Sequence, residues 1–574
     1  MRPPAEPGLA ETLAPAALVA LAALAPWAMG GVMPQAIVVV SGLSLLASAL
    51  VLLAGAARGS LELPSLPLWP LAGFLSLALL QLVPLPLAVH RLLAPGSYDV
   101  WHPADALVAG ILGASPRPIS LDPGTTLAAL ALTGGLSLLG VLSAPALARP
   151  RAAMGAIGVV AVSGFALSAY AIWARARFGS LLYGTIAVPT TAPFGPFVSK
   201  NHFAGWSVMA VLLVAGFALG LADGARRRGR DWTTDPRAGG VILAVVATLA
   251  MALASLASLS RGGAMALAAG VFCLLALRLG GARGRGAFVA TLVPALVLGG
   301  VLVGLVPQEA HERMRSLSGA SFRLDTWKDT LRLWSSSPIL GSGLGAFHDA
   351  YPRFKRGHGI LRVEHAENDY LETLAETGVL GLGFALVGVA LLVAPAGRGD
   401  ANAPGALARG IRQGAVAALA ALSVHSLVDF NLRIPSNAAL AAFAAAAAAA
   451  AAGARPRPPS RPLAAGLGIG VLALAAATAR LPERPWLLAR AELQAAASAS
   501  APAVRRLRLE RASVALERAL RQRPAAAESW LLLAFTHQAL GRADTAAAFA
   551  RHALVLDPER PGLREAVERF AGAP

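Results

Sequence analysis

Charged side chains are scarce in this chain. Asp, Glu, Lys and Arg make up 14% of its 574 residues, whereas 56% of the residues are hydrophobic. The mean hydropathy is +0.62. A water-soluble enzyme carries more charge on its surface than this composition supplies, so the scarcity excludes an ordinary soluble domain and indicates a polytopic membrane protein.

Cysteine and acidic residues are also few. The one cysteine, Cys273, lies inside a hydrophobic run, so no disulfide can form within the chain, and we expect a packing residue. Only 31 acidic residues stand against 49 Lys and Arg, which gives a formal net charge of +18. The arginines are scattered over short loops and form no single basic face, so nucleic-acid binding is not expected. No cleavable signal peptide is evident, so we expect the first hydrophobic span to remain part of the protein.

Long apolar runs are what the sequence has in abundance. Each is about twenty residues long, enough to cross about 30 Å of hydrocarbon. They predict an all-α, polytopic membrane protein of about 12–13 transmembrane helices, with a large loop on one side and a C-terminal helical repeat domain. The expected spans are 13–33, 35–57, 67–89, 124–148, 152–173, 201–222, 239–259, 262–279, 286–307, 371–395, 408–427, 436–453 and 463–480.

The basic residues of the short loops predict the orientation of these spans, because such loops collect on the cytoplasmic side. The N-terminus is then cytoplasmic, and with about thirteen spans the region after 481 lies outside. The outer segments are 91–123, 174–200, the turn at Ser260-Arg261, the insert 308–370 and the turn 428–435. The arginines of the cytoplasmic loops are Arg58, Arg149, Arg151, Arg226, Arg227, Arg228, Arg230, Arg237, Arg278, Arg283, Arg285, Arg398, Arg409, Arg412, Arg455, Arg457 and Arg461.

Several cations and histidines nevertheless fall on the outer side: Lys200, His202, Arg261, Arg323, His365, His425 and Arg433. A cluster of this kind at one membrane face could bind the phosphates of a lipid-linked substrate. For Arg261 we favour function over a snorkelling arginine, because it departs from the charge bias. Arg323 is equally well explained as a solvated charge, and His365 is more often a surface histidine. For Asp429 and Arg433 we prefer a structural ion pair.

The polar insert is too long for a simple connector, so we expect a folded extramembrane element that covers a site. Its run Gly341-Ser342-Gly343-Leu344-Gly345 superficially resembles a phosphate-binding loop. It lacks the following Lys-Ser/Thr and the strand-to-helix context of such a loop, so a tight backbone turn is expected instead.

The C-terminal region, 481–574, has the composition of soluble amphipathic helices. One stretch fits the tetratricopeptide template of about 34 residues, through Trp530, Leu533, Gly541, Ala546, Ala550, Ala553 and Pro558. A less regular copy precedes it. Two repeats are fewer than a stable solenoid usually needs, so we expect this domain to lean on the insert, the membrane part or a partner. The simpler alternative is a helical hairpin with no binding role.

Five motifs resemble the O-antigen ligase and O-antigen polymerase superfamily of bacterial membrane glycosyltransferases. Their order and spacing match over roughly 200–435. They are Phe197 to Gly205, Ser260-Arg261-Gly262, Arg323 with Trp327 and the Pro338-to-Gly345 run, His365 to Gly378, and His425 to Pro435. We therefore divide the chain into N-terminal spans (1–199), a ligase-like core (200–435) with a periplasmic loop (308–370), final spans (436–480) and a periplasmic tetratricopeptide-like domain (481–574).

The resemblance implies a transferase of the bacterial inner membrane that uses an undecaprenyl-diphosphate-linked glycan, without a metal or another cofactor. In this reading Arg261 and Arg323 contact the diphosphate. His365 acts as base or orienting group at the acceptor hydroxyl. Lys200 and His202 are secondary candidates, and the motifs add further substrate-binding candidates: Asn201, Asn368, Tyr370, His425 and Arg433.

One position departs from the family pattern. Many relatives have histidine directly before the Asn-x-Tyr-Leu element, where this chain has Glu367, and His365 lies two residues earlier. Either His365 or Glu367 could therefore be the base. A carboxylate can serve if burial raises its pKa, although it would also repel the donor phosphates.

The resemblance leaves the acceptor open between a lipid core, a growing polysaccharide and a protein, and the C-terminal domain could hold a protein partner. A transporter or flippase of lipid-linked sugars is the alternative, but it would place ionisable groups at mid-membrane and repeat one half of the chain in the other. A metal-dependent transferase with Asp369, Glu367 and Glu372 as ligands is a weaker rival, because these carboxylates form no obvious divalent site.

Overall fold

The computed structural model describes residues 9–113, 116–188, 192–226, 238–279, 318–356, 361–393, 405–450, 457–479 and 485–571. Over these residues the regular structure is helical. Apart from the helices, the described residues form only isolated β-bridges, such as the one between Leu63 and Arg457. The all-α prediction is confirmed. The predicted span 286–307, the stretch 308–317 of the insert and several of the loop arginines lie outside the described residues.

The chain folds into two compact units, each assembled from three separate stretches of sequence. The first, which we call the bundle unit, contains Met1–Leu68, Ala131–Ser316 and Val387–Ala479. The second, the insert unit, contains Trp69–Leu130, Leu317–Leu386 and Arg480–Pro574. The division of the sequence into four consecutive parts stays a prediction.

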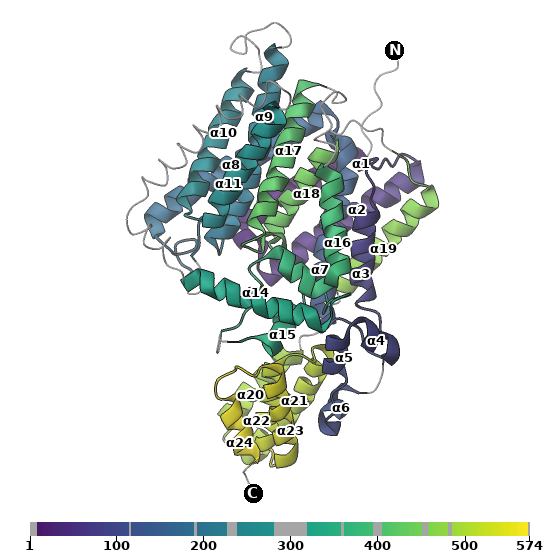
Figure 1. Ribbon diagram of the computed structural model, residues 1–574, viewed down its shortest axis with the longest axis vertical. Helices are drawn as coiled ribbons and strands as arrows, with labels where there is room; N and C mark the ends of the chain where they lie inside the picture. Colours follow the sequence, from purple (N-terminus) through teal and green to yellow (C-terminus); the bar gives the residue numbers. More distant parts are fainter. Residues whose placement is uncertain are drawn as a thin grey trace. The chain divides into compact units, whose positions relative to one another are not determined.

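The bundle unit is built from long apolar helices (Figure 1). Its elements are α1 (Leu9–Leu24), η1 (Ala25–Trp27), η2 (Met29–Gly31), α2 (Pro34–Arg58), most of α7 (Pro123–Leu147), α8 (Pro150–Phe178), α9 (Lys200–Arg226), α10 (Ala238–Ala257), α11 (Arg261–Leu279), α17 (Ala406–His425), η6 (Asn431–Arg433), α18 (Pro435–Ala450) and α19 (Arg461–Ala479).

The insert unit is built from shorter and more polar helices. Its elements are α3 (Trp69–Leu80), α4 (Leu87–Leu93), α5 (Pro95–Trp101), α6 (Ala106–Leu112), α14 (Ser318–Ser336), α15 (Phe347–Ala350), η3 (Tyr351–Phe354), most of α16 (Asp369–Val393), α20 (Pro485–Ser498), α21 (Pro502–Gln522), α22 (Ala527–Ala539), α23 (Ala543–Leu556) and α24 (Leu563–Ala571).

Eight of the described helices are long and apolar enough to cross a membrane: α2, α7, α8, α9, α10, α11, α16 and α19. Three shorter apolar helices, Thr12–Trp27, Trp69–Leu80 and Pro435–Ala450, fall on three further predicted spans. These helices make the chain a multi-pass membrane protein. The predicted span 408–427 coincides with α17, where Arg412 and Gln413 are buried inside the bundle. A helix surrounded by other helices does not face lipid, so it tolerates such residues.

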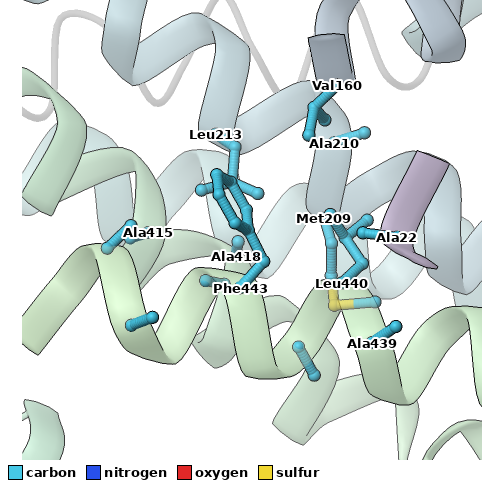
Figure 2. Close-up of a cluster of buried hydrophobic side chains, with 14 of the residues drawn as sticks. Ala22, Val160, Met209, Ala210, Leu213, Ala415, Ala418, Ala439, Leu440 and Phe443 are labelled. Carbon is cyan, nitrogen blue, oxygen red and sulfur yellow. The ribbon is translucent and has the colours of Figure 1, made fainter. Parts of the chain in front are cut away.

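Helix α9 is the centre of the bundle unit. In its most apolar window 89% of the residues are buried, against 28% for α10 and 22% for α11. Side chains from α9, α17 and α18 meet at its core, among them Met209, Leu213, Ala418 and Phe443 (Figure 2). Helix α17 crosses α9 at glycines: a Cβ on Gly216 would lie 2.5 Å from the Gly410 carbonyl oxygen. Small residues of this kind let two membrane helices approach closely.

In the insert unit, the C-terminal helices α20–α24 pack on the polar insert. Arg523 binds Asp349 through two hydrogen bonds of 2.7 Å, from Nε and from Nη2. Lys355 Nζ lies 3.2 Å from Asp557 Oδ1, and both side chains are buried. Of the three supports expected for the C-terminal region, the insert, the membrane part and a partner, the structure shows the insert.

Candidate functional site

The first candidate cluster lies in the bundle unit, where α9 and α11 begin. Lys200 Nζ donates to the Leu259 carbonyl at 3.0 Å, and Ser260 Oγ donates to Asn201 Oδ1 at 2.9 Å. Leu259 has a φ of 56°, in the left-handed region. The turn between α10 and α11 is thus fastened to the start of α9, and it delivers Arg261 as the first residue of α11 with an exposed side chain.

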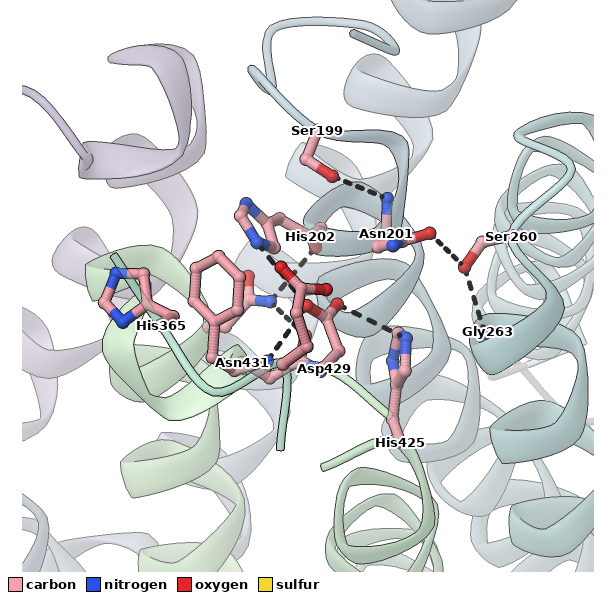
Figure 3. A network of polar contacts seen from close by, with 12 residues as sticks. Ser199, Asn201, His202, Ser260, Gly263, His365, His425, Asp429 and Asn431 are labelled. Atoms are coloured by element: carbon pink, nitrogen blue, oxygen red, sulfur yellow. Dashed lines mark hydrogen bonds and ion pairs between the residues drawn. The ribbon is translucent and has the colours of Figure 1, made fainter. Parts of the chain in front are cut away.

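A buried aspartate stands between two histidines in the same cluster (Figure 3). Asp429 Oδ1 lies 3.7 Å from His202 Nε2, and its Oδ2 lies 3.6 Å from His425 Nε2. All three side chains are buried. The ring of His425 also packs on α11, since a Cβ on Gly262 would be 2.8 Å from its Cδ2 atom. These contacts draw the ends of α9, α11 and α17 together.

The electrostatics of this cluster favour an anion. Lys200 and Arg261 are the first residues of their helices, where the helix dipole already supplies partial positive charge. A cation at this end is unfavourable for the helix by a few tenths to about 1 kcal/mol. The two cations together with two helix N-termini form the kind of positive end that binds phosphate groups.

Arg433 lies half-buried on η6, next to Asn431, which accepts a hydrogen bond from Asn437 at 2.9 Å.

The second candidate cluster lies in the insert unit and begins with an ion pair. Arg323 Nη2, on α14, lies 3.2 Å from Glu367 Oε2, and both side chains are about a quarter exposed, at 28% and 26%. Glu367 has a φ of 54°. A left-handed backbone conformation in a residue other than glycine costs on the order of 1 kcal/mol of folding free energy. Such conformations are found mainly at functional sites.

A second carboxylate in this cluster holds the candidate histidine. His365 Nδ1 lies 2.9 Å from Glu372 Oε1, and the Ala366 amide donates to Glu372 Oε2 at 2.8 Å. The Glu372 side chain is 1% exposed and that of His365 is 32% exposed. A carboxylate accepts hydrogen bonds and does not donate them, so it keeps the imidazole proton on Nδ1. The atom able to accept a further proton is then Nε2.

The residues that follow Glu367 start a helix. Asn368 Oδ1 accepts hydrogen bonds from the amides of Tyr370 and Leu371, both at 3.0 Å, so Asn368 caps α16. Its side chain is buried, whereas that of Tyr370 is half-buried in the first turn. The cap fixes the position of Glu372 one turn further along α16. It thereby supports the histidine that Glu372 holds.

The glycine-rich run wraps around a kink in α16. Gly378, inside α16, has a φ of 65°, and a Cβ there would collide with the Ile339 carbonyl. The amides of Ser342 and Gly343 donate to the carbonyls of Ala375 and Glu376 at 3.1 and 3.0 Å. The prediction of a tight backbone turn is confirmed.

One buried glutamine from a distant segment completes this turn. Gln81 Nε2 donates to the carbonyls of Leu340 (2.6 Å) and Glu376 (2.7 Å), and its Oε1 accepts from the Leu344 amide at 3.0 Å. Gln81 is fully buried. It therefore ties the end of α3 to both the glycine turn and α16.

Among the residues that the structure describes, one group has the composition of a metal site: Asp122, His348 and Asp349. Arg523 Nε lies 3.3 Å from Asp122 Oδ2, and the same guanidinium binds Asp349. Burial alone would raise the pKa of Asp349, but His348 and Arg523 lower it overall. The guanidinium already supplies the positive charge that these carboxylates require, so we assign the group to the docking of the C-terminal helices.

Part of the chain matches a known protein family. Residues 246–386 match the family model described as O-antigen ligase. The match covers about a quarter of the chain and includes Arg261, Arg323 and the segment from His365 to Tyr370, while His202 and His425 lie outside it. No curated protein matches the chain. The match supports the O-antigen ligase resemblance of the motifs, and that family implies a membrane glycosyltransferase-like enzyme with lipid and glycan substrates.

The sequence named most of these residues but not their partners. In the region that matches the O-antigen ligase model, the sequence suggests Glu372 only as a metal ligand of a metal-dependent transferase. In the structure Glu372 binds His365, and Glu367 binds Arg323. For Asp429 the structure adds two histidine neighbours, His202 and His425, while its ion pair with Arg433 stays a prediction. One signal was available: an asparagine cap with an acid in the next turn places that acid over the residues preceding the helix.

Proposed function

We propose that this protein transfers a glycan from an undecaprenyl-diphosphate-linked donor to an acceptor hydroxyl at the periplasmic face of the bacterial inner membrane. The observation that carries the proposal is the hydrogen bond between His365 and the buried Glu372 inside the O-antigen ligase region. A histidine held by a carboxylate is a common arrangement for a general base. The resemblance indicates a reaction without a metal ion or another cofactor.

The base in this proposal is His365 rather than Glu367. Glu372 keeps the proton on Nδ1, so Nε2 takes the proton of the acceptor hydroxyl as its oxygen attacks the anomeric carbon. The bond from that carbon to the diphosphate oxygen breaks in the same step, and the configuration inverts. Glu367 is engaged with Arg323, and to act as base it would have to give up this ion pair.

Arg323 is the proposed electrophilic partner in the insert unit. A guanidinium binds phosphate oxygens through two parallel hydrogen bonds and stabilises the charge that grows on the departing diphosphate. In the structure Glu367 holds this guanidinium at 3.2 Å. We infer that the donor diphosphate replaces the Glu367 carboxylate on Arg323, and that Glu367 keeps the guanidinium oriented until then.

Arg261 and Lys200 of the bundle unit keep the proposed role of phosphate contacts. The support is their place at the N-termini of α11 and α9, where anions are favoured. His202, Asn201, His425 and Arg433 remain candidates for sugar or phosphate contact. The proposal also includes a tetratricopeptide-like C-terminal domain that holds a protein partner. The acceptor in it is a lipid core, a polysaccharide or a protein.

Reconstituted glycan transfer tests the proposal. Purified protein in liposomes receives an undecaprenyl-diphosphate-linked glycan and each acceptor class in turn, with and without a chelator. His365→Ala and Arg323→Ala should each lower the transfer rate by about 10²–10⁴-fold. Glu367→Gln should leave the rate within about tenfold of the wild type, because His365 keeps its own carboxylate.

Lys328→Ala is the matched control for Arg323→Ala. Lys328 lies on the same helix, its side chain is 66% exposed, and it forms an i, i+3 ion pair with Asp325. Full activity of His365→Ala together with loss in Glu367→Gln would assign the base to Glu367. Unimpaired transfer in both arginine variants, Arg261→Ala and Arg323→Ala, would overturn the mechanism. Movement of the intact donor across the bilayer without transfer would favour a flippase.

A further inference from the structure

The C-terminal helices leave one groove open, between α20 and α21. It encloses ≈ 890 Å³. Three of the apolar side chains that line it are half exposed: Leu488 at 50%, Leu507 at 48% and Val514 at 49%. Half-exposed leucines and valines that share one depression mark a surface suited to a partner.

The spacing of the exposed residues on α21 indicates the shape of that partner. Six of them, along the whole helix, follow one another at intervals of three and four residues, the pattern by which one helix packs lengthwise against another. On α20 the groove residues Pro485, Leu488 and Glu492 have the same spacing. These six exposed residues are Val504, Leu507, Arg511, Val514, Arg518 and Arg521.

The charge of the groove is unbalanced. Its two acidic side chains are already paired, Glu492 with Arg508 at 2.9 Å and Glu510 with Arg506 at 3.4 Å. Arg511 and Arg518 line the groove and form no ion pair with any residue that the structure describes. The surplus is positive, so acidic side chains complement it.

The two ends of this helical array also differ. At the far end α24 packs on α23 and buries Leu563 and Phe570. At the other end α6 packs on α21, where Arg521 donates to the Ile111 carbonyl at 2.9 Å, but Leu488, Leu507 and Val514 stay half exposed. Arrays of helix pairs need a covering element at each end, because every pair exposes an apolar face to the next.

We propose that the α20–α21 groove binds an amphipathic helix of another protein, in which acidic side chains flank the apolar stripe. A second copy of this chain is the poorer occupant, because a symmetric contact would place Arg511 and Arg518 against the same arginines. The inference does not depend on the proposed glycan transfer. Substitutions in the groove should leave transfer to a small acceptor unchanged.

A charge-reversal experiment on the full chain in detergent tests this. The probes are two labelled synthetic helices of three heptads, both with leucine at positions a and d, one with glutamate and one with lysine at e and g. Fluorescence anisotropy should give a Kd about tenfold lower for the glutamate helix than for the lysine helix. Arg511→Glu with Arg518→Glu should reverse the order, and Val514→Asp should weaken both.

Arg505→Glu is the matched control, because Arg505 is exposed on α21 but does not line the groove. It should change either Kd by less than about threefold. An unchanged order of the two helices after charge reversal would overturn the proposal. A concentration-dependent dimer that Val514→Asp abolishes would assign the groove to a second copy. Displacement of the glutamate helix by anionic lipid micelles would assign it to a lipid surface.

Discussion

Replacing Glu372 by glutamine changes almost nothing in shape but changes which atom of His365 carries the proton. The carboxylate accepts two hydrogen bonds, from His365 Nδ1 at 2.9 Å and from the Ala366 amide at 2.8 Å. Glutamine offers one accepting oxygen and one donating amide group. If the oxygen keeps the Ala366 amide, the amide group faces Nδ1 and moves the imidazole proton to Nε2.

The opposite orientation of the glutamine side chain is disfavoured. Its amide group would then face the Ala366 N–H, and a buried donor without an acceptor costs about 1–3 kcal/mol. Moving the imidazole proton avoids that cost. We therefore expect Glu372→Gln to have the wrong tautomer, with the transfer rate constant about 10²–10⁴-fold lower and the KM for the donor close to that of the wild type.

Steady-state transfer in liposomes measures both constants, and thermal unfolding in detergent checks the fold. Glu364→Gln is the control, since Glu364 lies in the same segment with its side chain 67% exposed. A rate for Glu372→Gln within about threefold of the wild type, with normal folding, would refute the assignment of His365 as a base held by Glu372.

Three further outcomes follow from the insert unit. Gln81→Leu removes three hydrogen bonds and takes from the Leu340 carbonyl and the Leu344 amide the partner that Gln81 supplies, so it should lower stability by about 2–5 kcal/mol, seen as a lower Tm. Arg523→Ala leaves the Asp349 carboxylate buried without its cation, so we expect a loss of about 3–5 kcal/mol and faster hydrogen exchange in the C-terminal helices. Burial lowers the pKa of His537 and of His552 to about 4. In the unfolded chain these histidines have the ordinary pKa of about 6.5, so they take up protons at a higher pH than in the folded chain. The helices should therefore lose stability as the pH falls from about 6.5 to 4.

Each of these outcomes has a control and a contrary result. Gln494→Leu, on the exposed side of α20, is the control for Gln81→Leu, and Arg506→Ala, at a side chain 73% exposed, is the control for Arg523→Ala. Each control should have a Tm within about 1 °C of the wild-type Tm. Equal Tm values for Gln81→Leu and Gln494→Leu would contradict the role given to Gln81. Hydrogen exchange unchanged in Arg523→Ala would show that apolar packing alone docks the C-terminal helices. A stability that stays flat from pH 6.5 to 4 would contradict the burial of the two histidines.

The sequence predicted the membrane helices well because hydropathy is a local property. Helices α2 and α7 to α11 each contain a window of 18 residues with a high mean hydropathy, 1.9 to 2.6. The run 67–89 differs, because α3 ends at Leu80, before Pro84, and Gln81 is buried there by carbonyls of a distant segment. No local pattern reveals such partners.

The candidate site was predicted in part for the same reason. Arg323, His365 and Glu367 belong to short motifs that can be read directly. Their pairing depends on the direction of the chain at Glu367, where φ is 54° without a glycine to indicate it. That left-handed residue separates the two carboxylates, so that Glu367 binds Arg323 and Glu372 binds His365. The docking of Arg523 on Asp349 joins residues 174 positions apart, which no pattern within one segment foretells.

The interleaved order of the insert unit has a consequence for biosynthesis. A ribosome adds about 5–20 residues per second, so Arg523 follows its partner Asp349, 174 residues earlier, by roughly 9–35 seconds. During this interval the segment that carries Arg323 and His365 is already made but lacks the helices that pack on it. We therefore expect a newly made chain to complete this unit only when its last helices pack on the insert, and a chain that ends before Arg523 to lack this docking contact.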